Sequence, residues 1–273
     1  MTEEVPALIG KYKVQSKIAQ GGMGVVYKAI HPSLKRDVVI KKMAMKSSSM
    51  AKERFKKEAQ ILLDMQSPYI VHLFDYFTEG PYRYMVEEFV DGLALDKLIK
   101  KQTIVDPLVA LLILQDACFA LKFAHSKGIV HRDIKPANIL ISRRAEVKLA
   151  DFGIASDEND DPNDKTQSGV TLGTPAYMPP EQFENSSTVD NRADIYALGI
   201  MLYEMVTGTK PYPSEYSKEN SYSFSSHLAF TSLASLLTIT FSSLYFVSKL
   251  YTKTSSFFII PVFLLFLISI LAF

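Results

Sequence analysis

The 273-residue sequence contains one cysteine, Cys118, and no tryptophan. A single cysteine cannot form an internal disulfide, which suits a reducing compartment. The first ten residues, MTEEVPALIG, carry acidic residues where a secretory signal carries basic ones, and they lack an apolar run. We therefore expect the first part of the chain to stay in the cytoplasm.

An excess of either charge is also missing. Thirty basic residues stand against 29 acidic ones, which leaves a net charge of +1. A chain of this balance lacks the electrostatic basis for binding nucleic acid, so we expect no nucleic-acid partner. Hydrophobic residues make up 48% of the sequence and aromatic residues 11%, which predicts a substantial buried core.

Residues 214–273 contain no glycine, aspartate or arginine, although average usage predicts about four glycines in a segment of this length. One interpretation is a reading-frame shift or a truncated gene joined to unrelated sequence. The other is a genuine tail that anchors the protein to a membrane. Residues 257–273, FFIIPVFLLFLISILAF, are uncharged and lie at the short limit for one membrane span.

Strand-like segments come first along the chain. Each has a short apolar run bounded by turn residues, and the first three predict an antiparallel sheet. These segments are 11–20, 24–30, 36–43, 71–77 and 82–89.

Helical periodicity appears in three segments, at 51–65, 107–128 and 193–208. The second has Asp106 as its N-cap and proline in its first turn. The third is apolar on nearly all faces and should be buried. In the first, four side chains share one predicted face: Phe55, Ile61, Leu62 and Met65. Loops dominate between the second and third helices, so the order predicts a small sheet lobe followed by a helical lobe.

A glycine cluster, IAQGGMGVVYKA, lies at a predicted strand-turn-strand. Glycine lets the backbone approach a phosphate without a Cβ atom in the way. On these residues alone, an ordinary hairpin turn is an equal alternative. Lys41 on the third strand can reach the same cleft and pair with Glu58 of the first helix. The alternatives are a solvated lysine and an exposed carboxylate.

Three further motifs decide between these alternatives: HRDIKPAN at 131–138, LADFG at 149–153 and GTPAYMPPEQ at 173–182. Together with GGMGVVYKA and DIYALGIMLYEMVTG, they have the order and spacing of the protein kinase signature. From about residue 9 to 213, the sequence resembles the eukaryotic-like Ser/Thr protein kinases of bacteria.

The resemblance implies an α+β, bilobal protein kinase fold. Its small antiparallel β-sheet lobe with one helix should span residues 9–90. Its mainly helical lobe should span 91–213, and this lobe is incomplete because the family continues with several more helices. Residues 214–273 then form a separate hydrophobic tail.

The resemblance also implies a protein Ser/Thr kinase that uses ATP and Mg²⁺, phosphorylates protein substrates and acts in signalling. Asp133 matches the base that accepts the hydroxyl proton, and Lys135 matches the lysine that neutralises the transferred phosphoryl group. Lys41 should hold the ATP phosphates, oriented by an ion pair with Glu58. Asn138 and Asp151 match the magnesium ligands. The implied nucleotide-binding residues are Ile18, Ala19, Gln20, Gly21, Gly22, Met23, Gly24, Val26, Lys41, Glu88, Val90, Asn138, Leu140 and Asp151.

Regulation is predicted in the polar stretch 154–172, which is rich in hydroxyls. Without a phosphate, this stretch reads as a disordered connection. The guanidinium of Arg132 could order it by pairing with a phosphate. By their distance from Thr174, the candidate autophosphorylation sites are Thr166, Ser168 and Thr171.

Two departures from the family pattern concern the nucleotide site. Ala19 replaces the first glycine of the loop, a mild change that should stiffen the loop. Glu87 stands where an apolar gatekeeper is typical, and its carboxylate must be protonated or find a partner. Lys41 is the nearest candidate, so Glu87 should compete with Glu58. The alternative to an active kinase is therefore a weakly active or inactive nucleotide-binding pseudokinase or scaffold.

Overall fold

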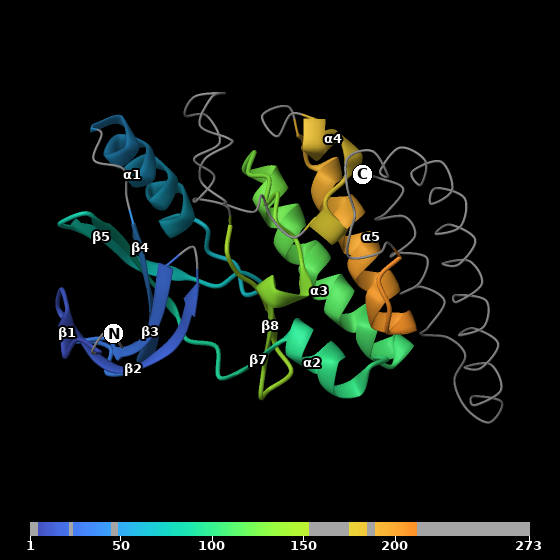
Figure 1. Ribbon diagram of the computed structural model, residues 1–273, viewed down its shortest axis with the longest axis horizontal. Helices are drawn as coiled ribbons and strands as arrows, with labels where there is room; N and C mark the ends of the chain where they lie inside the picture. Colours follow the sequence, from blue (N-terminus) through green and yellow to red (C-terminus); the bar gives the residue numbers. More distant parts are fainter. Residues whose placement is uncertain (1–4, 22–23, 45–48, 153–174, 185–188, 212–273) are drawn as a thin grey trace.

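The computed structural model describes residues 5–21, 24–44, 49–152, 175–184 and 189–211, which form two lobes (Figure 1). The first lobe is an antiparallel sheet with one helix, and the second is mainly helical. This arrangement confirms the predicted bilobal α+β fold. The tail 214–273 lies outside the described residues, so its separation from the kinase lobes stays a prediction.

The first lobe is built on a six-stranded sheet with the order β1-β2-β3-β4-β6-β5. The strands are β1 (Leu8–Ile9), β2 (Tyr12–Gly21), β3 (Gly24–Ile30), β4 (Asp37–Ala44), β5 (Leu73–Glu79) and β6 (Tyr82–Glu88). Burial alternates residue by residue along β3, because successive side chains of a strand point to opposite faces. All five strand-like segments of the sequence are strands in the structure.

Helix α1 (Ser49–Leu63) packs against the sheet through Phe55 and Ala59, which form a small cluster with Leu73 and Met85. The predicted place of Ile61 on the buried face is wrong, because its side chain is 48% exposed. Around the helix axis, Ile61 lies about 120° from Phe55 and about 160° from Ala59.

The described part of the second lobe contains four α-helices, two 3₁₀ turns and a small three-stranded sheet. Its longer helices are α2 (Leu95–Gln102), α3 (Pro107–Ser126) and α5 (Arg192–Thr207), with the short α4 (Pro180–Glu184), the 3₁₀ turns η1 (Pro136–Asn138) and η3 (Pro175–Tyr177), and the strands β7 (Gly92–Ala94), β8 (Ile139–Ser142) and β9 (Val147–Leu149). As predicted, Asp106 caps α3: its Oδ1 accepts hydrogen bonds from the backbone N–H groups of Leu108 at 2.9 Å and Val109 at 3.3 Å. The short strands were not predicted, because three or four residues give too few positions for a periodic pattern. Helix α2 was not predicted either, since its eight residues make only about two turns.

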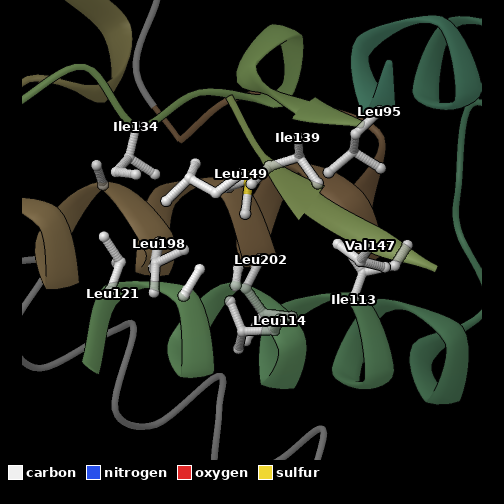
Figure 2. Close-up of a cluster of buried hydrophobic side chains, with 14 of the residues drawn as sticks. Leu95, Ile113, Leu114, Leu121, Ile134, Ile139, Val147, Leu149, Leu198 and Leu202 are labelled. Carbon is white, nitrogen blue, oxygen red and sulfur yellow. The ribbon is translucent and has the colours of Figure 1, made fainter. Parts of the chain in front are cut away.

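The main core lies between α3, α5 and the strands β8 and β9 (Figure 2). Leu114 and Leu121 of α3 face Leu198 and Leu202 of α5, while Leu149 covers them from the small sheet. Each fully buried side chain of this size contributes about 1.5–3 kcal/mol. The core therefore fixes the segment between β8 and α3 that carries the polar site.

Helix α3 is also long and apolar enough to cross a membrane, with a mean hydropathy of 1.7 over 18 residues. One face of α3 is nevertheless part of the main core and packs against α5 and β9. Burial inside the lobe therefore explains the apolar residues of one face only, because the side chains of Leu108, Val109, Leu112 and Phe119 are exposed. The predicted membrane segment 257–273 lies outside the described residues.

Two of the contacts that join the lobes within the described chain involve β9. The first lies where β6 leads into β7: the Nζ atom of Lys148 in β9 forms an ion pair with Oε2 of Glu88 at 2.8 Å. The second is a backbone bridge: Leu149 N–H donates to Tyr69 O at 2.8 Å, and Val71 N–H donates to Leu149 O at 2.9 Å. Strand β9, which leads to Asp151, therefore takes part in both contacts with the first lobe.

Candidate active site

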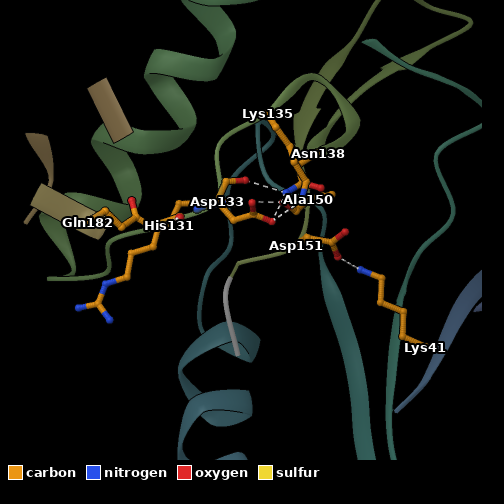
Figure 3. A network of polar contacts seen from close by, with 9 residues as sticks. Lys41, His131, Asp133, Lys135, Asn138, Ala150, Asp151 and Gln182 are labelled. Atoms are coloured by element: carbon orange, nitrogen blue, oxygen red, sulfur yellow. Dashed lines mark hydrogen bonds and ion pairs between the residues drawn. The ribbon is translucent and has the colours of Figure 1, made fainter. Parts of the chain in front are cut away.

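Two predicted catalytic residues, Asp133 and Lys135, lie together with the predicted magnesium ligand Asn138 in the loop between α3 and β8 (Figure 3). The Nζ atom of Lys135 donates to Oδ2 of Asp133 at 2.7 Å. The Nδ2 atom of Asn138 donates to the backbone oxygen of Asp133 at 2.8 Å and to Oδ2 at 3.2 Å. The loop thus places one carboxylate, one ammonium and one amide within hydrogen-bond reach of each other.

The same loop is anchored by a buried aspartate, Asp194 of α5, which is 1% exposed. Its two carboxylate oxygens accept the backbone N–H groups of His131 at 2.9 Å and Arg132 at 2.8 Å. The Nε2 atom of His125 lies 2.8 Å from Oδ2. Sequence reasoning missed this role, although an aspartate in the first turn of an apolar helix was a visible signal.

His131 links the loop to the chain before Asp151. Its Nδ1 accepts the backbone N–H of Asp133 at 3.2 Å, so Nε2 carries the hydrogen and donates to Ala150 O at 2.9 Å. The residue after Ala150, Asp151, has a left-handed backbone with φ of 62°. Such a conformation costs a non-glycine residue about 1–2 kcal/mol and persists only where the surroundings fix it.

Lys41 of β4 contacts two carboxylates, Glu87 on the neighbouring strand β6 and Asp151 of the second lobe. Its Nζ lies 2.6 Å from Glu87 Oε2 and also contacts Asp151 Oδ1 (Figure 3 draws the second contact). The contact with Glu87 is the one predicted from the sequence. The side chain of Glu58 lies outside the described residues, so its predicted pairing with Lys41 stays a prediction.

The charges in this cluster shift one another. Burial disfavours the charged form of Lys41, but Glu87 and Asp151 outweigh it and raise the pKa of the ammonium. Burial, the largest influence on Glu87, raises the pKa of its carboxyl although Lys41 opposes the change. For Asp151, the charge and hydrogen bond of Lys41 overcome the effect of burial and lower the pKa. Asp151 therefore favours the anionic form that binds a hard cation.

The glycine-rich segment forms the hairpin of β2 and β3, whose turn residues Gly22 and Met23 lie outside the described residues. Gly24 has φ of 136°, and a Cβ atom there would overlap the backbone oxygen of Lys42. A larger residue at Gly24 would therefore push the hairpin away from β4. The preceding predicted residues are exposed along β2: Ile18, Ala19, Gln20 and Gly21.

Of the remaining predicted nucleotide residues, Glu88 and Val90 lie at the link between the lobes, Val26 lies in β3 opposite Lys41, and Leu140 lies in β8. Val26, Glu88, Val90 and Leu140 are all partly buried. The carboxylate of Glu88 does not serve the nucleotide site alone. It forms an ion pair with Lys148 and accepts a hydrogen bond from the backbone N–H of His72 at 3.4 Å.

Of the predicted regulatory residues, the structure describes Arg132 and not the candidate phosphorylation sites. Thr166, Ser168 and Thr171 lie outside the described residues, as does Thr174. Arg132, predicted to bind a loop phosphate, has an exposed side chain. Its backbone oxygen accepts a 2.8 Å hydrogen bond from Gln182 Nε2. The guanidinium is thus carried by a backbone segment that is fixed from two sides.

Comparison with known proteins places this geometry in a family. The protein kinase domain model matches residues 12–253. The serine/threonine-protein kinase PknB of Mycolicibacterium smegmatis is 39% identical over 214 residues, which are 75% of this chain and 34% of the relative. The serine/threonine-protein kinase PknH of Mycobacterium bovis is 38% identical over 213 residues, 77% of this chain and 35% of the relative.

A solved structure is similar as well. The crystal structure of Rad53 1-466 in complex with AMP-PNP superposes with a TM-score of 0.63 and 26% sequence identity, over 78% of this chain and 52% of that chain. The chain spans about a third of the length of the curated relatives. The family match includes 214–253, where we found no motif, so the boundary at 213 stays a prediction. Because the family model covers most of the sequence and both lobes have the expected fold, the chain belongs to the protein kinase domain family.

Proposed function

We propose that the protein transfers the γ-phosphate of ATP to serine or threonine hydroxyls of protein substrates. The observation that carries the proposal is the cluster of Asp133, Lys135 and Asn138, which faces Asp151 and its partner Lys41 in one cleft. These residues supply a proton acceptor, two cations and oxygen ligands. Phosphoryl transfer needs this combination of positioning and charge stabilisation.

In this proposal, Asp133 accepts the proton of the acceptor hydroxyl on its carboxylate. Asn138 holds the carboxylate through Oδ2 and fixes the backbone through the carbonyl oxygen. Lys135 lies 2.7 Å from the same oxygen, so its ammonium can balance charge on the transferred phosphoryl group. Lys41 would bind the phosphates from the opposite wall of the cleft.

The donor set fits the Mg²⁺ that the family implies. The Nδ2 atom of Asn138 is used in hydrogen bonds to Asp133, which leaves Oδ1 as the atom suited to a cation. The carboxylate of Asp151 is 47% exposed and has a lowered pKa, as an oxygen ligand for a hard cation requires. When bound, Mg²⁺ would neutralise charge on the ATP phosphates.

The serine/threonine preference is supported by Lys135, which matches the lysine of that class, and by the names of the relatives. Incubating the purified protein with labelled ATP, Mg²⁺ and a basic protein substrate tests the proposal. Label should appear on serine or threonine after acid hydrolysis. Label on tyrosine alone would contradict the assigned preference.

The variant Asp133→Asn is the sharpest control. Transfer should fall by about 10²- to 10⁴-fold, because the general base is lost, while MgATP binding by calorimetry should change little. Unchanged transfer in this variant would contradict the role of Asp133 and with it the kinase assignment.

A second candidate is a nucleotide-binding pseudokinase or scaffold. It is favoured by the two carboxylates that already occupy Lys41, Glu87 and Asp151. This function predicts MgATP binding without label transfer in the unmodified protein. The transfer experiment therefore separates the two candidates.

Regulation and anchoring concern segments outside the described residues. We propose autophosphorylation at Thr166, Ser168 or Thr171, and a cytoplasmic kinase domain held at a membrane by one span at 257–273. Mass spectrometry of the intact protein would report its phosphates and its true carboxyl terminus. Expression should place the full chain with membranes or in aggregates, whereas a soluble full chain would contradict the anchor.

A further inference from the structure

The contact between Lys41 and Glu87 is built into the sheet. The two residues lie on the neighbouring strands β4 and β6, where Val39 pairs with Glu87. Lys41 follows Val39 by two positions, so its side chain shares a face with Glu87. The two side chains are 18% and 9% exposed, and the Nζ and Oε2 atoms lie 2.6 Å apart.

The support for this contact is rigid. Strands β4 and β6 pair continuously from Val38 opposite Glu88 to Ala44 opposite Tyr82. Backbone hydrogen bonds therefore set the separation between Lys41 and Glu87. Helix α1, which carries Glu58, joins the sheet through side-chain packing of its apolar face. The helix can shift without breaking a backbone ladder, whereas Glu87 cannot.

The contact is also compatible with phosphate binding. An ammonium has three donors, and Lys41 directs contacts to Glu87 and Asp151. One donor remains for a phosphate oxygen, and a second becomes free when Asp151 binds Mg²⁺. Glu87 is buried and needs a cation, which makes its pairing with Lys41 persistent.

In protein kinases, an ion pair between this lysine and a helix glutamate must form for activity, and movement of that helix controls it. We propose that Glu87 is the carboxylate that positions Lys41 in this protein, so that the placement of Lys41 does not depend on the position of α1. This inference rests on the proposed function. It reverses the competition between Glu87 and Glu58 that the sequence alone suggested.

Matched glutamine variants test the assignment. MgATP affinity by calorimetry and the kcat and KM of transfer should be measured for Glu87→Gln, Glu58→Gln and the exposed control Glu53→Gln. Glu87→Gln should weaken MgATP binding and lower kcat by at least about tenfold, since a charged hydrogen bond is lost. Glu58→Gln should have a clearly smaller effect, and Glu53→Gln should match the unmodified protein.

A double-mutant cycle separates positioning from a general structural effect. If Glu87 acts through Lys41, Glu87→Gln should cause no further loss of MgATP affinity once Lys41→Met is present. Additive losses would overturn the proposal. Thermal unfolding by circular dichroism checks that each variant is folded at the assay temperature.

Two other results would overturn the proposal even if Glu87→Gln folds poorly. The first is a larger loss in Glu58→Gln than in Glu87→Gln. The second is tighter MgATP binding in Glu87→Met, which would show that Glu87 diverts Lys41. If the unmodified protein transfers no phosphate, the proposed function fails, but the affinity measurements still decide which glutamate positions Lys41.

Discussion

The two walls of the nucleotide cleft are held by different physical means. On the wall of the second lobe, the backbone N–H groups of His131 and Arg132 donate hydrogen bonds to the buried carboxylate of Asp194. On the wall of the first lobe, the hairpin of β2 and β3 is exposed from Ile18 to Gly21 and is held by backbone pairing. One wall depends on hydrogen bonds from buried side chains, of which Asp194 makes the most, and the other depends on strand geometry.

This difference sets how each wall responds to substitution. A buried charged acceptor satisfies several donors at once, so its loss leaves all of them unpaired. An exposed hairpin loses only the local pairing or shape that a residue provides. Substitutions in the second lobe should therefore affect the whole fold, and those in the hairpin should stay local.

The largest effect is expected for Asp194→Ala. The change leaves two backbone N–H groups and His125 without their acceptor, and it should lower the free energy of unfolding by about 3 kcal/mol or more. Urea denaturation measures the loss. The exposed Asp190→Ala, just before the same helix, is the control and should change stability far less. An equal loss in both variants would contradict the anchoring role of Asp194.

The next effect is expected for Gly24→Ala in the hairpin. The new Cβ atom would meet the backbone of β4 at a positive φ, and the substitution should cost about 1–3 kcal/mol. Gly21→Ala, in the same hairpin, meets no atom within 4 Å and should be tolerated. Thermal unfolding of both variants compares them, and similar losses would show that the close approach at Gly24 is unimportant.

A smaller effect is expected for Lys148→Met, which removes the ion pair with Glu88 between the lobes. The Lys148 and Glu88 side chains are 15% and 28% exposed, so the loss should be about 1 kcal/mol. The control is Arg143→Met, whose pair with Asp91 joins nearby segments but is 80% and 69% exposed. If urea denaturation finds the Arg143 variant to be the less stable, burial does not govern these two pairs.

The smallest effect is expected for Ala19→Gly, which restores the residue typical of the family. Ala19 is exposed in β2, so the change should cost about 0.5–1 kcal/mol through the greater freedom of the unfolded chain. MgATP affinity should stay within a factor of about three, a change of less than 1 kcal/mol. A large gain in affinity would show that the Cβ atom of Ala19 obstructs the phosphates.

The fold was predictable wherever a local rule decides structure. The N-cap Asp106 marked the start of α3, and short apolar runs bounded by turn residues marked β3 and β4. The catalytic loop was found because Asp133, Lys135 and Asn138 stand at fixed offsets in one motif. Each of these features depends on residues that lie close together in the sequence.

Features that depend on distant residues were less accessible. Asp194 accepts hydrogen bonds from residues 62 and 63 positions earlier, which no periodic pattern encodes. Ile61 was placed on the wrong face because the helix face was judged by apolarity and not by its geometry against the sheet. The pairing of Lys41 with Glu87 was an exception, since a buried carboxylate requires a nearby cation.

The backbone bridge at Leu149 constrains how the lobes can move. The lobes are joined at the segment after Glu88 and again where Leu149 pairs with Tyr69 and Val71. Between Tyr69 and Val71, the side chain of Ile70 is 2% exposed and belongs to the core of the second lobe, so this bridge is packed as well as hydrogen-bonded. Asp151 follows Leu149 by two residues, so a change in the relative position of the lobes should be transmitted through this bridge to the backbone just before the carboxylate of Asp151.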